Sequence, residues 1–139
     1  MSRLDDLELL EPADREEWGR WLEANHATST GVWLAVGRKG GTRTRLDYDA
    51  AVEEALRFGW IDSVVHAMDA DRFRQLFTPR KPRGTWAPSN KRRVERLLAE
   101  GRMMPAGLAA IERAKANGSW DLIPDDGPSA ESGTPRTGT

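Results

Sequence analysis

The chain has 139 residues, 31% of them charged, and a net charge of −1, which together predict one soluble domain with a single modest core. Because the chain contains no cysteine, disulfides, thiolate nucleophiles and zinc–cysteine sites are excluded. With His26 and His66 as the two histidines, a histidine-rich metal site is disfavoured as well, and we expect neither a metal nor another cofactor.

The N-terminal stretch is acidic and has no apolar run of the length that a signal peptide needs. No segment approaches the roughly 18 consecutive apolar residues of a membrane span. These observations predict a cytoplasmic protein without membrane insertion, and they leave its oligomeric state open.

The first predicted helix follows Asp14, which stands at the start of an approximate capping box. Trp18, Trp21 and Leu22 then recur at helical spacing. They indicate one apolar face on a helix that ends near Asn25.

Three strands are predicted from β-branched and aromatic residues. Residues 31–38 read as a mostly apolar central strand. Residues 60–68 and 72–78 flank the turn-like sequence at 69–71 and predict a β-hairpin. Aromatic and basic residues alternate in the last strand, so we expect one buried face and one basic face.

Three more helices are predicted further along the chain. The second follows Asp47 and shows a one-sided apolar stripe. Ser89 is the expected N-cap of the third, over residues 90–100. Pro105 opens the fourth, which ends at residues 117–118.

These elements predict a single α+β domain over residues 14–122, with a small antiparallel sheet of about three strands and about four helices packed mainly on one side. Residues 1–13 read as a polar lead. Residues 123–139 are rich in Pro, Gly, Ser and Thr and predict a disordered tail.

A basic segment from Arg72 to Arg102 carries the strongest functional signal in the chain. It contains ten basic residues and two acidic ones, which points to an anionic partner. Lys91 and the two arginines after it occupy the first turn of a predicted helix, where each cation costs roughly 0.3–1 kcal/mol against the helix dipole. A bound anion would offset that cost, and pairing within the protein or solvation explains the pattern equally well.

Arg80 lies between two prolines that stiffen the chain, close to Trp86. A rigid arginine beside a tryptophan suits recognition of a phosphate or a carboxylate. The alternative is a structural salt bridge from Arg80 to Asp62 or Glu54. Trp60 and Trp86 are candidate stacking platforms, although a position like that of Trp60 more often belongs to the core.

We expect the ligand-binding residues to share one cleft with Glu54 and Asp62, and they are Trp60, Arg80, Trp86, Ser89, Asn90 and Lys91. The candidates for a general base are Asp62, His26 and Glu54. For Asp62 an arginine partner is the common alternative, and for His26 a capping or buried hydrogen-bonding role is favoured. The sequence has no P-loop, nucleophile elbow or G-x-G-x-x-G motif, so whether the protein is an enzyme stays open.

Several segments between Trp18 and Asp121 resemble the YdeI/OmpD-associated family, also labelled bacteriocin-protection proteins. They are EEWGRWLEANHATSTGVWL, YDAAVEEALRFGWIDS, FTPRKPRGTWAPSNKRRVERLLAEGRM and PAGLAAIERAKANGSWD. The resemblance implies a role in protection against bacteriocins or antimicrobial peptides. By position, the motif residues of that family correspond to Trp60, Asp62, Phe77, Thr78, Pro79, Arg80, Trp86, Asn90 and Lys91.

Three functional hypotheses follow. The first is a domain that binds a small phosphate- or carboxylate-bearing anion in a cleft lined by arginine and tryptophan, in a stress or resistance role. The second is a nucleic-acid-binding protein that uses the basic face 72–102. The third is a small enzyme with an Asp or His general base and an arginine that holds an anion.

Overall fold

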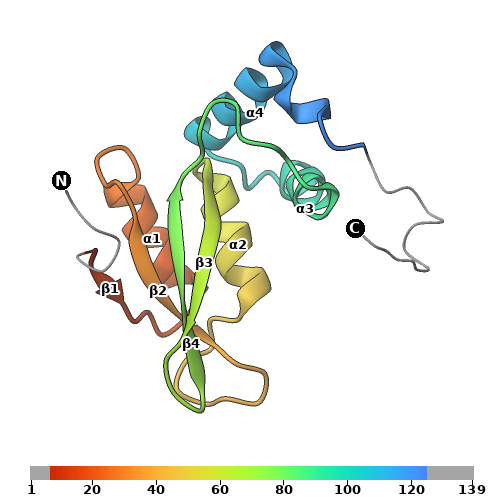
Figure 1. Ribbon diagram of the computed structural model, residues 1–139. Coiled ribbons are helices and arrows are strands. Elements are labelled where there is room, and N and C mark those ends of the chain that lie inside the picture. Colours follow the sequence, from red (N-terminus) through yellow and green to blue (C-terminus); the bar gives the residue numbers. More distant parts are fainter. Residues whose placement is uncertain (1–6, 125–139) are drawn as a thin grey trace.

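The computed structural model describes residues 7–124. The predicted disordered tail, apart from its first two positions, lies outside the described residues. In chain order the elements are β1 (Leu9–Leu10), α1 (Arg15–Asn25), β2 (Val32–Gly37), α2 (Tyr48–Arg57), β3 (Trp60–Ala67), β4 (Arg72–Pro79), α3 (Pro88–Ala99), α4 (Pro105–Asn117) and the short 3-10 helix η2 (Ser119–Asp121) (Figure 1).

The four strands form one mixed sheet in the order β1-β2-β4-β3. β2, β4 and β3 are antiparallel, and β3 and β4 form the predicted hairpin, whereas β1 runs parallel to β2 with Leu9 opposite Trp33. The α+β class and the four α-helices are confirmed, and the four strands are close to the expected number of about three. The expectation of an antiparallel sheet is wrong at β1, whose parallel pairing with β2 makes the sheet mixed. Two residues are too few to show strand periodicity, so the pattern of the polar lead does not predict β1.

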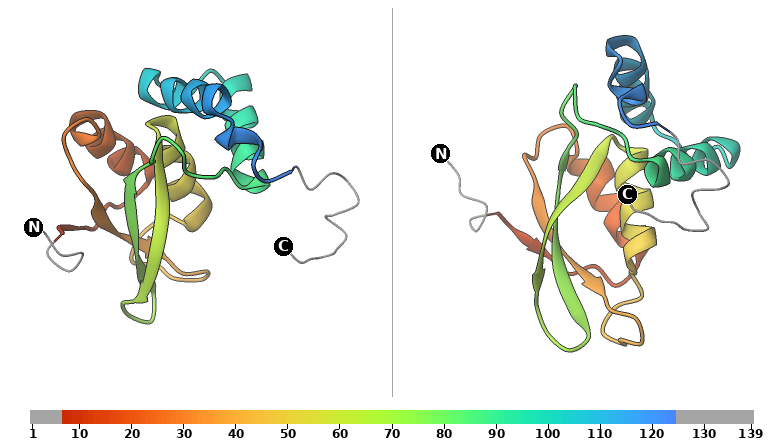
Figure 2. Two further views of the ribbon diagram at one scale, coloured as in Figure 1. Left: turned by 45° about the horizontal axis from the view of Figure 1, so that its top comes forward. Right: turned by 45° about the vertical axis from the view of Figure 1, so that its right-hand side comes forward.

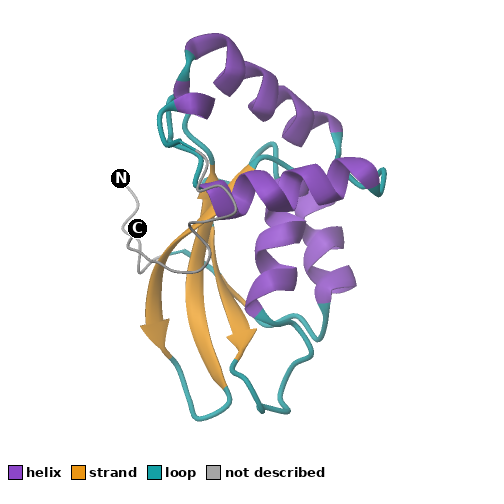
Figure 3. Ribbon diagram, turned by 90° about the vertical axis from the view of Figure 1, so that its right-hand side faces the viewer, coloured by secondary structure: helices purple, strands orange, loops and turns teal. Residues whose placement is uncertain are grey.

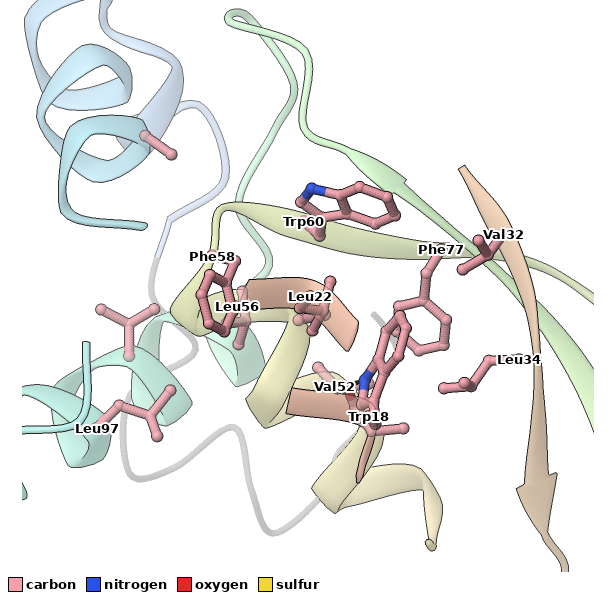
Figure 4. Close-up of a cluster of buried hydrophobic side chains, with 14 of the residues drawn as sticks. Trp18, Leu22, Val32, Leu34, Val52, Leu56, Phe58, Trp60, Phe77 and Leu97 are labelled. Carbon is pink, nitrogen blue, oxygen red and sulfur yellow. Dashed lines mark hydrogen bonds between the residues drawn. The ribbon is translucent and has the colours of Figure 1, made fainter. Parts of the chain in front are cut away.

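Helices α1 and α2 cover one face of the sheet (Figure 3). Successive side chains of a strand point to opposite faces, so Val32 and Leu34 of β2 join Phe77 of β4 on the helix side. Trp18 of α1 packs edge-on against Phe77, and its ring N–H donates to the carbonyl of Ala51 in α2 (Figure 4). This contact joins both helices to the sheet at the centre of the core.

Helices α3 and α4 lie beyond the end of the sheet at which β3 begins and β4 ends (Figure 2). Gly59, between α2 and β3, adopts the left-handed conformation with φ +77°. A Cβ atom at this position would lie 3.1 Å from the carbonyl oxygen of Ala106 in α4. The glycine therefore allows β3 to begin directly against α4.

Side-chain caps begin the first two helices as predicted. Asp14 accepts a hydrogen bond from the Glu17 amide at 3.0 Å, and Asp47 accepts one from the Ala50 amide at 2.9 Å. The expectation that Ser89 caps the third helix is wrong.

Helix α3 begins at Pro88, its N-cap residue is Ala87, and no side chain caps it. Proline is suited to the first helical position because its φ is preset and its missing N–H has no partner there. The helix therefore starts earlier than the pattern indicates, and Ser89 lies inside the first turn.

Candidate functional site

A depression of about 280 Å³ lies between the start of β3 and the loop that follows β4. Two of the predicted site residues, Asp62 and Arg80, line it. The complete lining consists of Ile61, Asp62, Ser63, Thr78, Pro79, Arg80, Lys81, Gly84 and Thr85.

Arg80 is 9% exposed and is held by its own loop. Its backbone N–H donates to the Gly59 carbonyl at 3.0 Å, and its Nη2 donates to the Thr85 carbonyl at 2.7 Å. Its guanidinium carbon lies 3.6 Å from the ring centre of Trp86. Arg80 therefore stacks directly on Trp86, and among the described residues it forms no salt bridge to Asp62 or Glu54, the alternative expected from the sequence.

Arg80 Nε and Nη1 are both shielded from water and have no hydrogen-bond partner in the described part of the chain. Burial lowers the pKa of Arg80 to about 10, and the charge of Asp62 opposes that shift. The group therefore stays cationic at neutral pH. A buried cation with unpaired donors is costly unless something else pairs with it.

Asp62 lies at a β-bulge in β3, where the pairing with β4 shifts register between Asp62 and Val65. The Tyr48 hydroxyl of α2 and the Gln75 side-chain amide of β4 each donate to Asp62 Oδ2 at 3.0 Å. Oδ1 accepts no hydrogen bond from the described residues. Burial, followed by the charge of Asp62, raises the pKa of Tyr48 to about 12, so the tyrosine remains a donor.

Trp86 supports Arg80 from behind and does not line the depression. It is 2% exposed, and its ring lies 4.9 Å from that of Trp120 in η2. Lys91 is also buried here: its ammonium lies 5.5 Å from the Trp120 ring and donates to the Ile123 carbonyl at 3.2 Å. Trp86 and Lys91 therefore hold the C-terminal turn against α3.

Glu54 does not share the depression with Arg80. It is 2% exposed and accepts hydrogen bonds from Arg15 at 3.0 Å, from Arg102 at 2.6 Å and from Arg57. A Cβ atom at Gly19 of α1 would lie 2.7 Å from Glu54 Oε1, so a glycine is needed for α1 to approach this carboxylate. Glu54 is therefore the centre of a buried ion-pair network that joins α1, α2 and the start of the loop after α3.

Ser89 also lies elsewhere, in a separate cleft of about 340 Å³ between α2 and α3. Next to it, Arg93 donates to the side chains of Asn90 at 3.1 Å and Asp49 at 2.6 Å. The expected single cleft is therefore wrong: Asp62 and Arg80 come together, whereas Glu54 and Ser89 lie in two other places. Their separation follows from the way α3 docks, with its first turn against α2.

Trp60 and His26 belong to the core and to a helix end. Trp60 is 1% exposed and packs edge-on against Trp21, so it does not offer a stacking platform to a ligand. His26 caps the C-terminus of α1, and its Nδ1 lies 2.8 Å from the Leu22 carbonyl oxygen, to which it must donate. Neither residue lines the depression.

Tyr48 and Gln75 also belong to the site, because both donate to Asp62, and neither was predicted as a site residue. Gln75 lies between Phe73 and Phe77 on the same face of β4, the face that points to the helices, and it is 2% exposed. A polar residue at a buried strand position was the signal that could have identified it. For Tyr48 the sequence holds no comparable signal.

Among residues 7–124, no helix has both the length and the apolar character needed to cross a bilayer. In the same range, no group of three or more His, Asp or Glu side chains is placed to hold a metal ion.

Comparison with curated proteins and with solved structures finds no match to this chain. One protein family, described as a domain of unknown function, DUF8412, matches residues 10–110. This match includes Asp62, Arg80, Trp86 and all four strands except one residue of β1. It spans more than half of the sequence, and the chain therefore belongs to the DUF8412 family.

Proposed function

We propose that this protein binds a small anionic molecule, bearing a phosphate or a carboxylate, in the depression beside Arg80. The observation that carries the proposal is the absence of partners for Arg80 Nε and Nη1 among the described residues. Leaving charged donors unpaired in a buried place costs more than a typical hydrogen bond contributes. An anion seated against the guanidinium would supply the missing acceptors.

Access to those nitrogens requires a local adjustment, because both are covered in this fold. Part of the lining of the depression is formed by Lys81, Gly84 and Thr85, which lie in the irregular loop that also contains Arg80. Trp86 fixes the guanidinium from the other side. A shift of this loop that breaks the hydrogen bond from Arg80 to the Thr85 carbonyl would expose the guanidinium to a ligand.

The resemblance to the YdeI/OmpD-associated family supplies a biological setting for the proposal. It suggests a role in stress or antimicrobial-peptide resistance, with Asp62, Arg80 and Trp86 at matching motif positions. No specific observation favours an enzymatic role for this depression. Of the three candidates for a general base, only Asp62 lines it, whereas His26 and Glu54 do not.

The nucleic-acid hypothesis is weakened by what the basic residues do in the fold. Among the described residues, Arg72, Arg93, Arg96 and Arg102 of this segment form ion pairs with acidic groups of the same protein. The Arg74 guanidinium covers Trp33 at 4.2 Å, and Arg80 is buried. Part of the positive charge of the segment is thus paired within the protein, and part of it does not face an external partner.

The test is a thermal-shift and calorimetric screen at physiological salt with phosphate, sulfate, sugar phosphates, nucleotides and small carboxylates. We expect at least one of these anions to raise the melting temperature, and we expect Arg80→Met to abolish that shift. The matched control is Arg83→Met, which removes the same charge from an exposed position in the same loop. Stabilisation by oligonucleotides alone, lost with added salt, would favour the nucleic-acid hypothesis, and no response to any anion would refute the proposal.

A further inference from the structure

The depression beside Arg80 carries both signs of charge on its walls. Arg80 and Asp62 both line it, and the charge of Asp62 acts on Arg80. The two side chains nevertheless do not form an ion pair with each other in the fold. The two opposite charges therefore border the same depression without neutralising each other by contact, and the local adjustment described above gives a ligand access to the Arg80 guanidinium.

The hydrogen-bonding groups left over on the two sides are complementary to each other. On the Arg80 side, Nε and Nη1 are donors without partners among residues 7–124. On the Asp62 side, both Tyr48 and Gln75 donate to Oδ2, which leaves Oδ1 as an acceptor. Behind Asp62, the buried Oε1 of Gln75 is a second acceptor with no partner in that range.

Asp62 is also fixed in place, as a binding carboxylate needs to be. Tyr48 comes from α2 and Gln75 from the central strand β4, so two different elements orient the same oxygen. The β-bulge that begins at Asp62 in β3 sets the direction in which its side chain leaves the strand. Such support holds Oδ1 at a constant position relative to Arg80.

A ligand with a single charge would meet one attractive and one repulsive wall. A simple anion would lie near the Asp62 carboxylate, and a simple cation would lie near the Arg80 guanidinium, so either would lose part of its binding energy to like-charge repulsion. A molecule with an ammonium at one end and a carboxylate at the other would meet attraction at both ends. The volume of about 280 Å³ suits a molecule smaller than a drug-sized ligand.

We propose that the ligand of this depression is a zwitterion of the α-amino acid class, whose carboxylate pairs with Arg80 and whose ammonium pairs with Asp62. This inference rests on the proposed anion-binding function and narrows it. Ser63, Thr78 and Lys81 on the remaining walls would then contact the side chain of the amino acid.

The experiment compares three forms of each amino acid in a panel by calorimetry or NMR titration. The free amino acid carries both charges, its N-acetyl derivative keeps the carboxylate alone, and its methyl ester keeps the ammonium alone. For at least one side chain, we expect the free form to bind about tenfold or more tightly than either derivative.

Asp62→Asn should remove the preference for the free form over the N-acetyl form, whereas Arg80→Met should abolish binding of both. The control Asp71→Asn makes the same chemical change in the turn at the far end of the β-hairpin. The melting temperature and the ultraviolet spectrum of each variant establish that it is folded.

The outcomes separate this inference from the function on which it rests. Suppose that simple anions, such as phosphate or the N-acetyl derivatives, bind the wild-type protein at least as tightly as free amino acids do. The inference that the ligand is a zwitterion is then wrong, and the proposed anion-binding function stands. If neither amino acids nor simple anions bind, both proposals are wrong. Equal loss of the preference in Asp62→Asn and Asp71→Asn would show that Asp62 does not contact the ligand.

Discussion

The guanidinium carbon of Arg80 lies 3.6 Å from the ring centre of Trp86, the shortest cation–aromatic distance among the described residues. A desolvated pair of this kind contributes about 2 kcal/mol or more. The stack occupies one face of the guanidinium and leaves its N–H edges for other partners. Trp86 therefore positions Arg80 for a ligand, and it is not itself a wall of the site.

Arg80→Met is expected to change the free energy of unfolding by less than about 1 kcal/mol. The substitution loses the stack with Trp86 and the hydrogen bond to the Thr85 carbonyl, but it also removes a buried charge whose Nε and Nη1 lack partners among the described residues, and these effects oppose each other. Urea denaturation measures the difference. A loss of more than about 3 kcal/mol would show that Arg80 has a structural role, which would remove the main support for anion binding.

Trp86→Ala is expected to lower the free energy of unfolding by about 3–5 kcal/mol. The buried ring contacts both Arg80 and Trp120, so its removal leaves a cavity between the loop and η2. The same urea titration applies, with Tyr48→Ala as a control at a half-exposed aromatic position. Equal effects of the two substitutions would contradict the central position of Trp86 in the packing.

Tyr48 is the single tyrosine of the chain, so its ionisation can be followed directly by absorbance near the phenolate band. We expect a midpoint at a pKa of about 12, because burial and then the charge of Asp62 disfavour the phenolate. In Asp62→Asn the midpoint should fall but remain above the ordinary value of 10.0, since burial persists. A group whose folded pKa is raised contributes stability below pH 10 that is lost as the pH rises toward 12. An unchanged midpoint in Asp62→Asn would contradict the contact between these two residues.

Glu54→Gln is expected to lower the free energy of unfolding by about 3–5 kcal/mol, because it leaves arginines from three segments without their shared buried carboxylate. The matched control is Asp49→Asn, which breaks an ion pair with Arg93 at a largely exposed carboxylate and should cost about 1 kcal/mol or less. Thermal unfolding of both variants makes the comparison. Equal losses would mean that burial does not set the strength of these pairs.

Asp47→Ala and Ser89→Ala test the two helix starts. Asp47 caps α2, so its replacement should cost about 1 kcal/mol. Ser89 lies in the first turn of α3 without capping it, so its replacement should change stability by less than about 0.5 kcal/mol. A cost for Ser89→Ala that matched that of Asp47→Ala would indicate that Ser89 caps α3 and that the helix begins at Asn90, two residues later than Pro88.

The sequence predicted those parts of the fold that depend on neighbouring residues. Asp14 and Asp47 cap their helices, and the residues around 69–71 form the turn of a hairpin, because these features are decided within a few positions of the chain. Arg80 and Trp86 are six residues apart, and their contact was likewise predictable from their spacing and the stiff prolines.

The remaining contacts of the site join distant segments and could not be predicted in this way. Two partners of Glu54, Arg15 of α1 and Arg102 after α3, are distant in sequence and are fixed by the docking of whole helices. The same holds for Asp62, whose partners Tyr48 and Gln75 meet at this residue because α2 packs against β3 and β3 pairs with β4. Periodicity indicates which face of an element is buried, but it does not indicate which residues of two elements meet.

The contact between Trp86 and Trp120 has a practical consequence. The last described turn, η2, leans on the same ring that supports Arg80, and Lys91 holds the following residues through the Ile123 carbonyl. A movement of Arg80 that shifts the Trp86 ring would therefore also act on Trp120 and on the turn around it. A fluorophore attached at the exposed Leu122, which does not line the depression, would report such a movement.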